Sequence, residues 1–582
     1  MGIQPLEGTK TSRNLTSLIP ILVWLPRYNR TWLVADILAG LTLWGLVVPE
    51  GMAYAGIAGL PPQAGLYTLV ASLLVYALLG SSRHLSVGAT SATAALIAST
   101  VVALGATSAD MATYSAYAAA LVLVIGVIFL VAGVARLGWV TQFLSKPVMD
   151  GFVTGLALFV AVGQLNKLFG VEKGEGNVFQ KIFAVIKQLP EANWVTFVVG
   201  ASALALLFLL PRWNKKIPAG LVVLFGSIAL SLALNLNANY GVAVAGVLPQ
   251  GLPALALPKV SFDTVLEMIL PAIGIFLLAY SEALGVAREF AEKHGYEVDP
   301  DQELNAHAIT NLASGLFGGM IAAGGMSASA VKEGAGARTQ IANLVAWGVT
   351  LVTLLFLTPL FTSLPEAVLA ALIIHAVWHI LTARKLAKIR LVSRTEFWLA
   401  ALTLLGVLFI DVLQGMIIGL VASVLLILYQ SSRPHISALG HVPGIPGAYT
   451  DLKRHPENIK VPGVLILRLD APMYYANALT VRERIKALLA DTQPPPRAVV
   501  WDSTGQDTVD ITSAEVIKGL LVELKNKEID FYVAEMHAPV REFSQRTGLL
   551  DMIGEDHIFP TLDVAVRFLE MPARSGKADS AE

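Results

Sequence analysis

The sequence predicts a polytopic α-helical membrane protein with a small α/β domain at its C-terminal end. Its 582 residues are 55% hydrophobic and only 14% charged, whereas soluble proteins carry roughly a quarter charged residues. Apolar runs of about 20 residues, long enough to cross a bilayer, recur from Ala35 to Gln430. Beyond Arg433-Pro434 the composition becomes that of a soluble domain. The chain therefore faces lipid over most of its length.

About fourteen apolar segments can be delimited by flanking charges, glycines and prolines. They cover residues 37–54, 65–80, 91–104, 114–135, 148–168, 195–210 and 221–236 in the first half, and 269–287, 306–321, a short stretch from Ser327, 341–357, 365–381, 397–412 and 416–429 in the second. An even number of spans places both chain ends on the same side of the membrane.

Loop charges indicate that this side is the cytosol, since basic loops stay on the cytoplasmic side of an inner membrane. The loops predicted to be cytoplasmic are basic, most clearly at residues 384–394, whereas the Pro-rich segment 237–262, predicted to be outside, has Lys259 as its only basic residue. One loop disagrees, because Lys173, Lys181 and Lys187 lie on the predicted outer side.

The domain boundaries follow from these patterns. Residues 1–33 are predicted to form a cytosolic segment with a short interfacial helix, and residues 34–432 the membrane domain. Residues 433–572 are predicted to form a cytosolic domain in which strands, such as 464–469, 498–502 and 531–534, alternate with helices. Residues 573–582 are predicted to be a disordered tail.

Two of the apolar segments are too short to span a membrane, and both begin in small or hydroxyl residues. They start around Ser86–Thr93 and Gly324–Ser329, at matching places in the two halves. This pattern is typical of an inverted repeat whose broken helices meet near the midplane and direct their positive N-terminal ends at an anion. Small residues also simply allow helices to pack closely, but two such segments in register favour a binding site.

The candidate binding residues open these two broken helices, where backbone N–H groups and hydroxyls can hold an anion. They are Val87, Gly88, Ala89 and Thr90 in the first segment, with Ser86 and Ser91 beside them, and Met326, Ser327, Ala328 and Ser329 in the second.

Two carboxyl groups lie inside apolar spans. Glu50 and Glu282 occupy corresponding positions of the first and eighth segments, and ionisable groups at membrane depth are costly enough that a functional role is expected. Tyr54 lies one helical turn from Glu50, so it either contacts the same ligand or only packs between helices.

Several function classes are excluded. A formal net charge of −1 gives no reason to expect a nucleic-acid partner, and the absence of cysteine removes thiol catalysis and disulfides. The sequence contains no catalytic motif and no phosphate-binding loop, so neither an enzyme nor an ATP-driven pump is expected. No cofactor or metal is expected either.

The chain resembles the sulfate permease (SulP) family of anion transporters over essentially its whole length. The resemblance is carried by Val48–Ala55, Gly59–Pro62 and Gly65–Tyr67, and later by His294–Asp299 and Gly336–Gln340. The soluble part is similar to the STAS domain, through Arg433-Pro434, Leu469–Pro472, Tyr475–Asn477 and Asp510–Ser513.

This resemblance implies a fourteen-span fold of two inverted seven-span repeats, divided into core and gate domains and usually assembled as a homodimer. It implies transport of sulfate, bicarbonate, chloride, iodide, oxalate or dicarboxylates by elevator-like alternating access. It also implies that Glu282 matches a glutamate linked to coupling and substrate binding, and that Tyr54 matches an aromatic residue near the anion.

The chain departs from the family pattern at two site positions. Glu50 stands where many relatives have glutamine, and Ala328 where many have arginine, so the site is more negative. We therefore expect a proton or a sodium ion to accompany the anion, with Glu50 and Glu282 as coupling residues. Lys332 is an alternative source of positive charge, because it lies one turn beyond Ala328. Uncoupled anion exchange also remains open.

In the STAS-like domain, Thr512 and Ser513 follow Asp510 at a helix start, where related anti-sigma-factor antagonists are phosphorylated. A regulatory role there competes with simple helix capping. A cytosolic protein partner could bind this domain. Two other classes are less consistent with the sequence: a nucleobase permease, which the STAS-like tail disfavours, and a membrane-tethered signalling scaffold, which would not need buried glutamates.

Overall fold

The computed structural model describes residues 19–107, 109–139, 145–172, 174, 176–213, 219–246, 251–252, 254–378 and 383–571. The chain divides into two compact units, Met1–Ser423 and Val424–Glu582. The division falls within helix α20 (Val412–Ser431), because this helix continues from the membrane unit into the second unit. Lys173 and the tail 573–582 lie outside the described residues.

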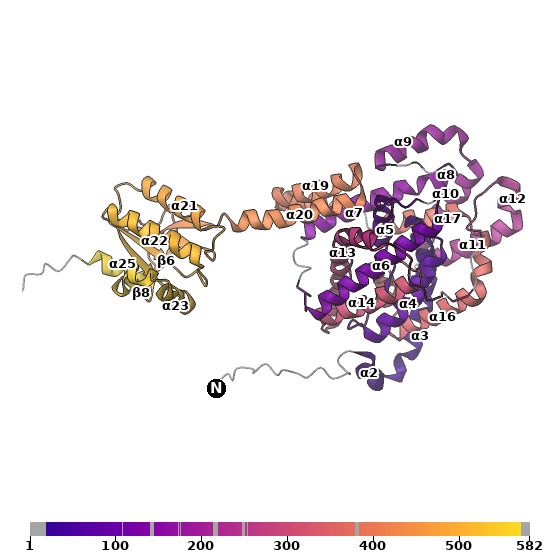
Figure 1. The fold of residues 1–582 in the computed structure, drawn as a ribbon, viewed down its shortest axis with the longest axis horizontal. Coiled ribbons are helices and arrows are strands. Elements are labelled where there is room, and N and C mark those ends of the chain that lie inside the picture. The colour runs from indigo at the N-terminus through magenta and orange to yellow at the C-terminus, as the bar shows by residue number, and fades with distance from the viewer. Residues whose placement is uncertain are drawn as a thin grey trace, which may run out of the picture. The chain divides into compact units, whose positions relative to one another are not determined.

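The membrane unit is built from helices that match the predicted apolar segments (Figure 1). The first half contains α3 (Leu33–Ile57), α4 (Gln63–Leu79), α5 (Ser91–Ala103), α6 (Met111–Val134), α7 (Lys146–Gly163), α10 (Trp194–Trp213) and α11 (Ala219–Leu234). The second contains α13 (Phe262–His294), α14 (Pro300–Leu316), α15 (Met326–Gly334), α16 (Ile341–Val352), α17 (Glu366–Trp378), α19 (Arg394–Phe409) and α20.

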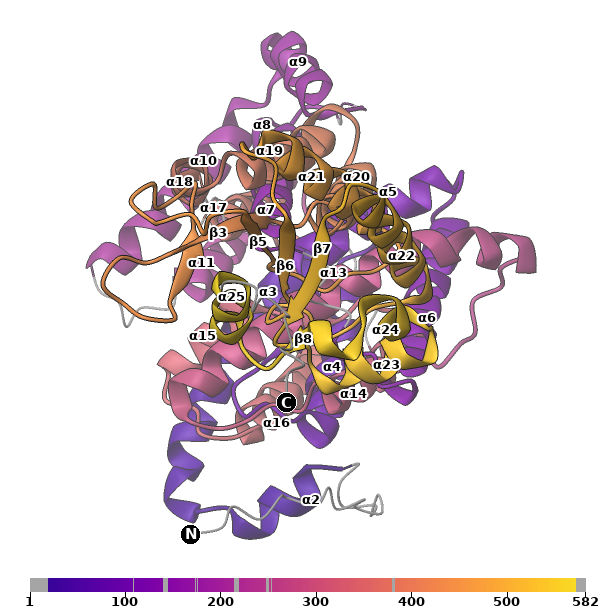
Figure 2. The same cartoon turned by 90° about the vertical axis from the view of Figure 1, so that its left-hand side faces the viewer.

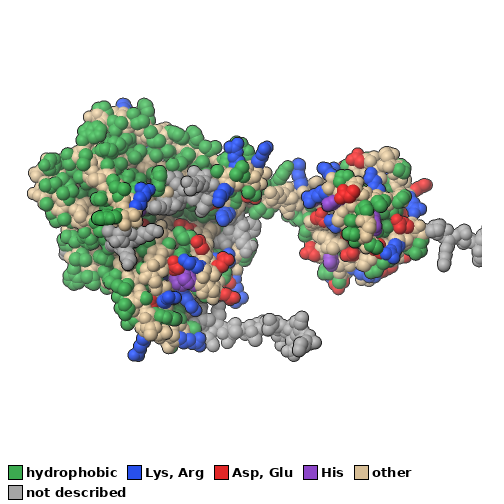
Figure 3. Space-filling model, turned by 180° about the vertical axis from the view of Figure 1, so that it is seen from behind, with side chains coloured by type: hydrophobic (Ala, Val, Ile, Leu, Met, Phe, Trp, Pro, Cys, Tyr) green, Lys and Arg blue, Asp and Glu red, His purple; other side chains and the backbone are tan. Residues whose placement is uncertain are grey.

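These helices are suited to a bilayer. Among the described residues, seven helices are long and apolar enough to cross a membrane, and four shorter apolar helices accompany them. Figure 3 shows hydrophobic side chains over much of the visible face of the membrane unit, whereas charged side chains of both signs cover the second unit. The prediction of a polytopic membrane domain is confirmed.

One predicted segment is displaced. The ninth segment was expected at residues 306–321, but α14 begins at Pro300 and ends at Leu316. The Asp299 side chain caps its start by accepting hydrogen bonds from the N–H groups of Asp301 and Gln302. Gly318, at φ +67°, then turns the chain out of the helix. The apolar residues beyond it form an extended segment instead.

The two halves pack in equivalent ways. Helix α14 of the second half packs against α6 of the first, and the equivalent helices α4 and α16 also pack together. In the same way, the contact between α19 and α7 has its equivalent in the contact between α10 and α17. Because seven helices is an odd number, the second half starts on the opposite face, which makes the repeat inverted. Helices α3–α6 and α13–α16 form the core group, and α7, α10, α11, α17, α19 and α20 the gate group.

The second unit is a six-stranded sheet in the order β4-β3-β5-β6-β7-β8. Its strands are β3 (Ile436–His441), β4 (Tyr449–Asp451), β5 (Val464–Leu469), β6 (Ala498–Asp502), β7 (Asp530–Ala534) and β8 (Ile558–Phe559). Strands β5 to β8 are parallel, whereas β3 runs antiparallel to its neighbours. The three predicted strands are confirmed as β5, β6 and β7.

Helices cover both faces of this sheet. Along β5, Leu465 and Leu467 join one apolar core and Val464 and Ile466 the other, because side chains alternate across a strand. Figure 2 shows α25 (Leu562–Glu570) on one side of the strands and α22 (Ile511–Asn526) on the other. Helices α21 (Ala478–Asp491), α23 (Ala538–Arg546) and α24 (Leu549–Ile553) complete the unit.

Candidate anion site

Two short strands join the halves at the centre of the membrane unit. Strand β1 (Val87–Gly88) pairs antiparallel with β2 (Ala323–Gly324), with Val87 opposite Gly324 and Gly88 opposite Ala323. Helix α5 follows β1, and α15 follows β2. Strand pairing therefore holds the N-termini of the two short helices at one place, as the sequence predicted.

The two helix starts differ in how their N–H groups are satisfied. At α5, Thr90 and Thr93 form a capping box, in which the Thr90 Oγ1 accepts from the Thr93 N–H at 3.3 Å. At α15 the cap position is Gly325, which has no side chain to accept such a bond. The first N–H groups of α15 are thus left for a ligand.

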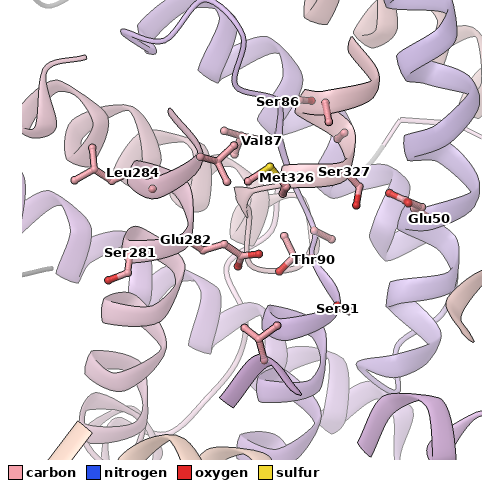
Figure 4. Close-up of a pocket in the computed structure, with 18 of the residues that line it drawn as sticks. Glu50, Ser86, Val87, Thr90, Ser91, Ser281, Glu282, Leu284, Met326 and Ser327 are labelled. Carbon is pink, nitrogen blue, oxygen red and sulfur yellow. The ribbon is translucent and has the colours of Figure 1, made fainter. Parts of the chain in front are cut away.

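A cavity of about 860 Å³ opens beside these helix starts (Figure 4). Ten of the predicted site residues line it: Glu50, Tyr54, Val87, Gly88, Ala89, Thr90, Glu282, Met326, Ser327 and Ala328. They come from α3, the β1–α5 segment, α13 and α15. Ser86 and Ser91 line the cavity as well.

Glu50 and Glu282 face this cavity from opposite walls. Figure 4 shows Glu282 reaching from α13 toward Thr90, and Glu50 on α3 near Ser327. Both side chains are half-buried. The Oε2 atom of Glu282 is fully buried and has no hydrogen-bond partner among the described residues. A buried oxygen without a donor is costly, so this atom requires a proton, a cation or water.

Ser329 was predicted to bind the anion, but it does not line the cavity. Its side chain is fully buried, accepts a hydrogen bond from the Ser86 N–H at 2.9 Å and donates to the Gly325 carbonyl at 2.7 Å. Because it faces back from the helix start, Ser329 fastens α15 to the segment that enters β1. It positions the site rather than contacting a ligand.

Lys332 does not supply the missing positive charge to the cavity. Its side chain is fully buried, and its Nζ donates to the Leu85 carbonyl and to Asn343 Oδ1, each at 3.0 Å. Gln340 Nε2 donates to the same Leu85 carbonyl at 2.9 Å. The lysine lies on the side of α15 that faces the core, and it fixes the residue before Ser86. Lys332 therefore does not line the cavity, and these contacts do not support the alternative in which it supplies the charge.

Four charged residues of the cavity were not predicted. Lys146 and Asp150 come from α7, and Arg288 and Glu289 from α13. Glu289 lies seven residues after Glu282 and hence on the same helix face, so its spacing could have revealed it. Nothing in the sequence near α7 indicates that Lys146 and Asp150 meet α13. Among the described residues, no cluster of His, Asp and Glu could hold a metal ion.

In the second unit, Asp510 caps α22. Its carboxylate accepts from the Ser513 N–H at 2.8 Å and from the Tyr475 N–H at 2.7 Å. Burial alone would raise the pKa of Asp510, but these hydrogen bonds outweigh it and hold the pKa below its usual value. The Ser513 hydroxyl is buried, whereas Thr512 is exposed, so Thr512 alone of the two candidates is accessible to a kinase.

Two inverted repeats whose broken helices meet at a central cavity define the class of secondary transporters. The particular family follows from the sequence comparisons. The family model described as the sulfate permease family matches residues 33–403, and the STAS domain model matches residues 455–565. The chain therefore belongs to the sulfate permease family of anion transporters and carries a STAS domain.

Comparisons with individual proteins agree with this family assignment. A probable sulfate transporter of Mycobacterium tuberculosis (strain CDC 1551 / Oshkosh) is 36% identical over 94% of this chain and 97% of that protein. The murine solute carrier 26 family member A9 anion transporter, solved in the inward-facing state, superposes with a TM-score of 0.88 at 25% identity, covering 97% of this chain and 96% of that one.

The transmembrane domain of the cyanobacterial bicarbonate transporter BicA shares the fold, with a TM-score of 0.59 at 24% identity over 68% of this chain and 98% of that one. These relatives are transporters and not enzymes. The protein is thus an anion transporter with a multi-pass membrane domain.

Proposed function

We propose that the protein carries a small oxyanion, of the sulfate, bicarbonate or dicarboxylate class, by secondary active transport. The observation that carries this proposal is the β1–β2 pairing, which places two helix N-termini on one cavity. Oxygen atoms of such anions accept hydrogen bonds from the N–H groups of α15 and the hydroxyl groups of Thr90 and Ser327. The sulfate and bicarbonate transporters among its relatives support the same substrate class.

We also propose that a cation accompanies the anion. Glu50 and Glu282 face the cavity, whereas each helix dipole offers only about half a positive charge. The two basic residues of the lining, Lys146 and Arg288, are equalled in number by the acidic residues Asp150 and Glu289. An anion entering beside an ionised carboxylate is repelled, so one carboxyl group has to be neutralised. A proton is the simplest means, and sodium bound by carboxylate and carbonyl oxygens is the alternative. Exchange without a cation is the competing mechanism.

Access to the cavity is proposed to alternate by movement of the core group against the gate group. The cavity is lined mainly by core residues, with Lys146, Met149, Asp150 and Val153 of α7 as its gate side. It extends toward Arg288, near the C-terminal end of α13. Beyond the other end of the site, Ser99 of α5 donates a hydrogen bond to Asp411 in the turn between α19 and α20. We infer that the cavity is open toward the cytosol and closed on the outside.

The experiment that tests the proposed function is uptake into proteoliposomes by the full-length protein. Labelled sulfate, bicarbonate, a dicarboxylate and, as a control, a nucleobase are offered while proton and sodium gradients are imposed separately. We expect saturable uptake of one oxyanion that a proton gradient accelerates. Uptake of the nucleobase alone, or of no solute, would exclude the proposal. Uptake that requires only a counter-anion inside would establish exchange.

The proposed location is the inner membrane, with both chain ends and the STAS domain in the cytosol. Because the chain has no cysteine, a single cysteine introduced at a loop reports its side directly. A membrane-impermeant maleimide is expected to label Lys259→Cys in intact cells, and Arg390→Cys only after permeabilisation. Labelling of both variants in intact cells would contradict the fourteen-span topology.

The contact between Ser99 and Asp411 gives a test of alternating access. In the pair variant Ser99→Cys/Asp411→Cys, oxidation is expected to form a disulfide between the core and gate groups. If the groups have to separate during transport, this crosslink will abolish uptake, and a reductant will restore it. The two single variants are the controls. Full uptake by a completely crosslinked protein would rule out relative movement at this point.

A homodimer and a cytosolic protein partner at the STAS domain are also proposed. The partner is supported by apolar side chains beside the exposed Thr512. Tyr475, Leu479 and Ile511 are 72%, 62% and 69% exposed, an unusual density of exposed large apolar groups for a soluble domain surface.

A further inference from the structure

A second cavity, of about 510 Å³, lies beside the N-terminal helices and away from the anion site. Its walls come from four segments that are distant in the sequence: residues 20–32, the loop between α4 and β1, the connection between α13 and α14, and the turn between α15 and α16. We refer to it as the arginine pocket, because Arg27, Arg83 and Arg338 line it, each from a different segment.

Within the part of the chain that the structure describes, the three guanidinium groups have no carboxylate partners. Among the described residues, none of the three lies within ion-pair distance of an Asp or Glu, and Arg83 instead stacks over the Tyr296 ring at 5.3 Å. Glu297 is the acidic residue of the lining. Like charges that converge on one cavity repel one another unless an anion occupies it. The pocket therefore has the charge of an anion site.

The buried carboxylate behind the pocket is already fully engaged. Asp36 is completely buried and accepts hydrogen bonds from the Tyr28 hydroxyl at 3.0 Å, from the Arg338 N–H at 2.7 Å, and from the Thr339 N–H and hydroxyl at 3.2 and 2.8 Å. Asp36 thus fixes the backbone behind the pocket and leaves the Arg338 guanidinium unpaired. The three arginine side chains are exposed, but the backbone that carries Arg338 is held in place by a buried carboxylate.

The surroundings of the pocket are those of a membrane interface. Trp24, Tyr28 and Trp32 line it, and such aromatic residues concentrate where headgroups meet hydrocarbon. Leu22, Val23 and Leu25 of the adjoining helices α2 (Ile21–Trp24) and η1 (Leu25–Arg27) are 53%, 45% and 46% exposed. Figures 1 and 2 both show α2 at one end of the membrane unit, beyond the start of α3.

We propose that the arginine pocket binds the phosphate of an anionic phospholipid headgroup. Guanidinium groups match phosphate oxygens in geometry and charge, and the cytoplasmic leaflet supplies anionic lipids at high local concentration. The apolar faces of α2 and η1 lie against the acyl chains of the same lipid. A free phosphate ion would satisfy the three arginines but not these exposed apolar residues, which is why the lipid is the favoured source.

A headgroup bound in the arginine pocket would also stabilise the segments that form the anion site. Arg83 lies two residues before Leu85, and Leu85 leads directly into Ser86 and β1. The Leu85 carbonyl accepts hydrogen bonds from Lys332, Gln340 and Asn343. Arg338 lies in the turn that follows α15. A headgroup that joins these two arginines connects the ends of both segments that form the site. Lipid binding is therefore expected to stabilise the core group.

The test compares the full-length protein with Arg27→Gln/Arg338→Gln and with the control Arg30→Gln/Arg454→Gln, whose arginines are exposed and do not line the pocket. Retention of phosphatidylglycerol is measured by native mass spectrometry, and melting temperature is measured in phosphatidylcholine with and without added phosphatidylglycerol. Inorganic phosphate and glycerol phosphate form separate arms.

We expect phosphatidylglycerol to raise the melting temperature of the wild type and of the control, and to be bound at least about tenfold more weakly by the pocket variant. The melting temperature of the pocket variant in phosphatidylcholine alone shows whether it is folded. The proposal is overturned if this folded variant retains phosphatidylglycerol as the wild type does. It is also overturned if inorganic phosphate stabilises the wild type and phosphatidylglycerol does not.

Discussion

Replacement of Glu282 by glutamine is expected to abolish uptake against a concentration gradient while leaving the protein folded. The Glu282 Oε2 is buried at the cavity and has no hydrogen-bond donor among the described residues, and in the proposed mechanism this carboxyl group binds and releases a positive charge during transport. A glutamine amide binds no proton in this range. For an electroneutral cycle with one proton, each pH unit drives up to about tenfold accumulation, and this accumulation should be lost.

Glu50→Gln provides the comparison within the site. Glutamine keeps the size and polarity of the Glu50 side chain but cannot ionise, so the variant is expected to transport but to depend less on the proton gradient. Glu267→Gln, an exposed position on the same helix as Glu282, is the matched control and should behave as the wild type. Uptake is measured in proteoliposomes under an inward proton gradient. If both site variants still concentrate substrate with the wild-type gradient dependence, carboxylate coupling is wrong.

The variant Lys332→Ala tests whether Lys332 contributes to cation coupling or only to the stability of the fold. Because the Lys332 Nζ is buried and hydrogen-bonded to Leu85 and Asn343, its removal is expected to lower the free energy of unfolding by about 2–4 kcal/mol. The yield and the melting temperature of the protein should fall as a result. Whatever folded fraction remains should keep the wild-type gradient dependence. A well-folded Lys332→Ala protein that has lost coupling would return the fixed-cation mechanism to consideration.

The sequence was sufficient for the fold and for the part of the cavity lining at the two helix starts, because both depend on local signals. Apolar runs define the helices, and the short segments starting near Ser86 and Gly324 define the half-helices that meet at the site, whereas the β1–β2 pairing between them was not predicted. The position of α14 was missed by several residues, since its polar first turns gave a weak apolar signal while the apolar residues after Gly318 gave a false one.

Side-chain direction at the site was harder to predict. The sequence places Ser329 and Lys332 on a helix that begins at the cavity, but α15 turns both toward the core, where Ser86 and Leu85 bind them. Helical spacing relates residues to one another and does not say which face meets the ligand. Lys146 and Asp150 were missed for a different reason, because their approach to α13 depends on how the gate group packs against the core group.

Gly324→Ala is expected to reduce transport at least about tenfold, because this position in β2 has no room for a side chain. A Cβ at Gly324 would lie 2.6 Å from the Ala283 Cα and 2.9 Å from the Ala283 Cβ, next to Glu282, and 3.0 Å from Leu85. Backbone at 2.6 Å cannot rotate away, so β2 has to move off α13. Overpacking of this kind costs about 1–3 kcal/mol and displaces the start of α15 from the cavity.

The matched control is Gly348→Ala in α16, where a Cβ would meet no atom within 4 Å and alanine favours the helix. This variant should keep wild-type uptake and an equal or higher melting temperature. Adding Ala283→Gly to Gly324→Ala removes the contact between the two Cβ atoms but not the contact with the Ala283 Cα, so it should restore uptake only in part. Uptake and melting temperature are measured for all three proteins. Wild-type values for Gly324→Ala would mean that β2 can separate from α13 without disturbing Glu282, and the close approach of these two segments would then have no part in forming the anion site.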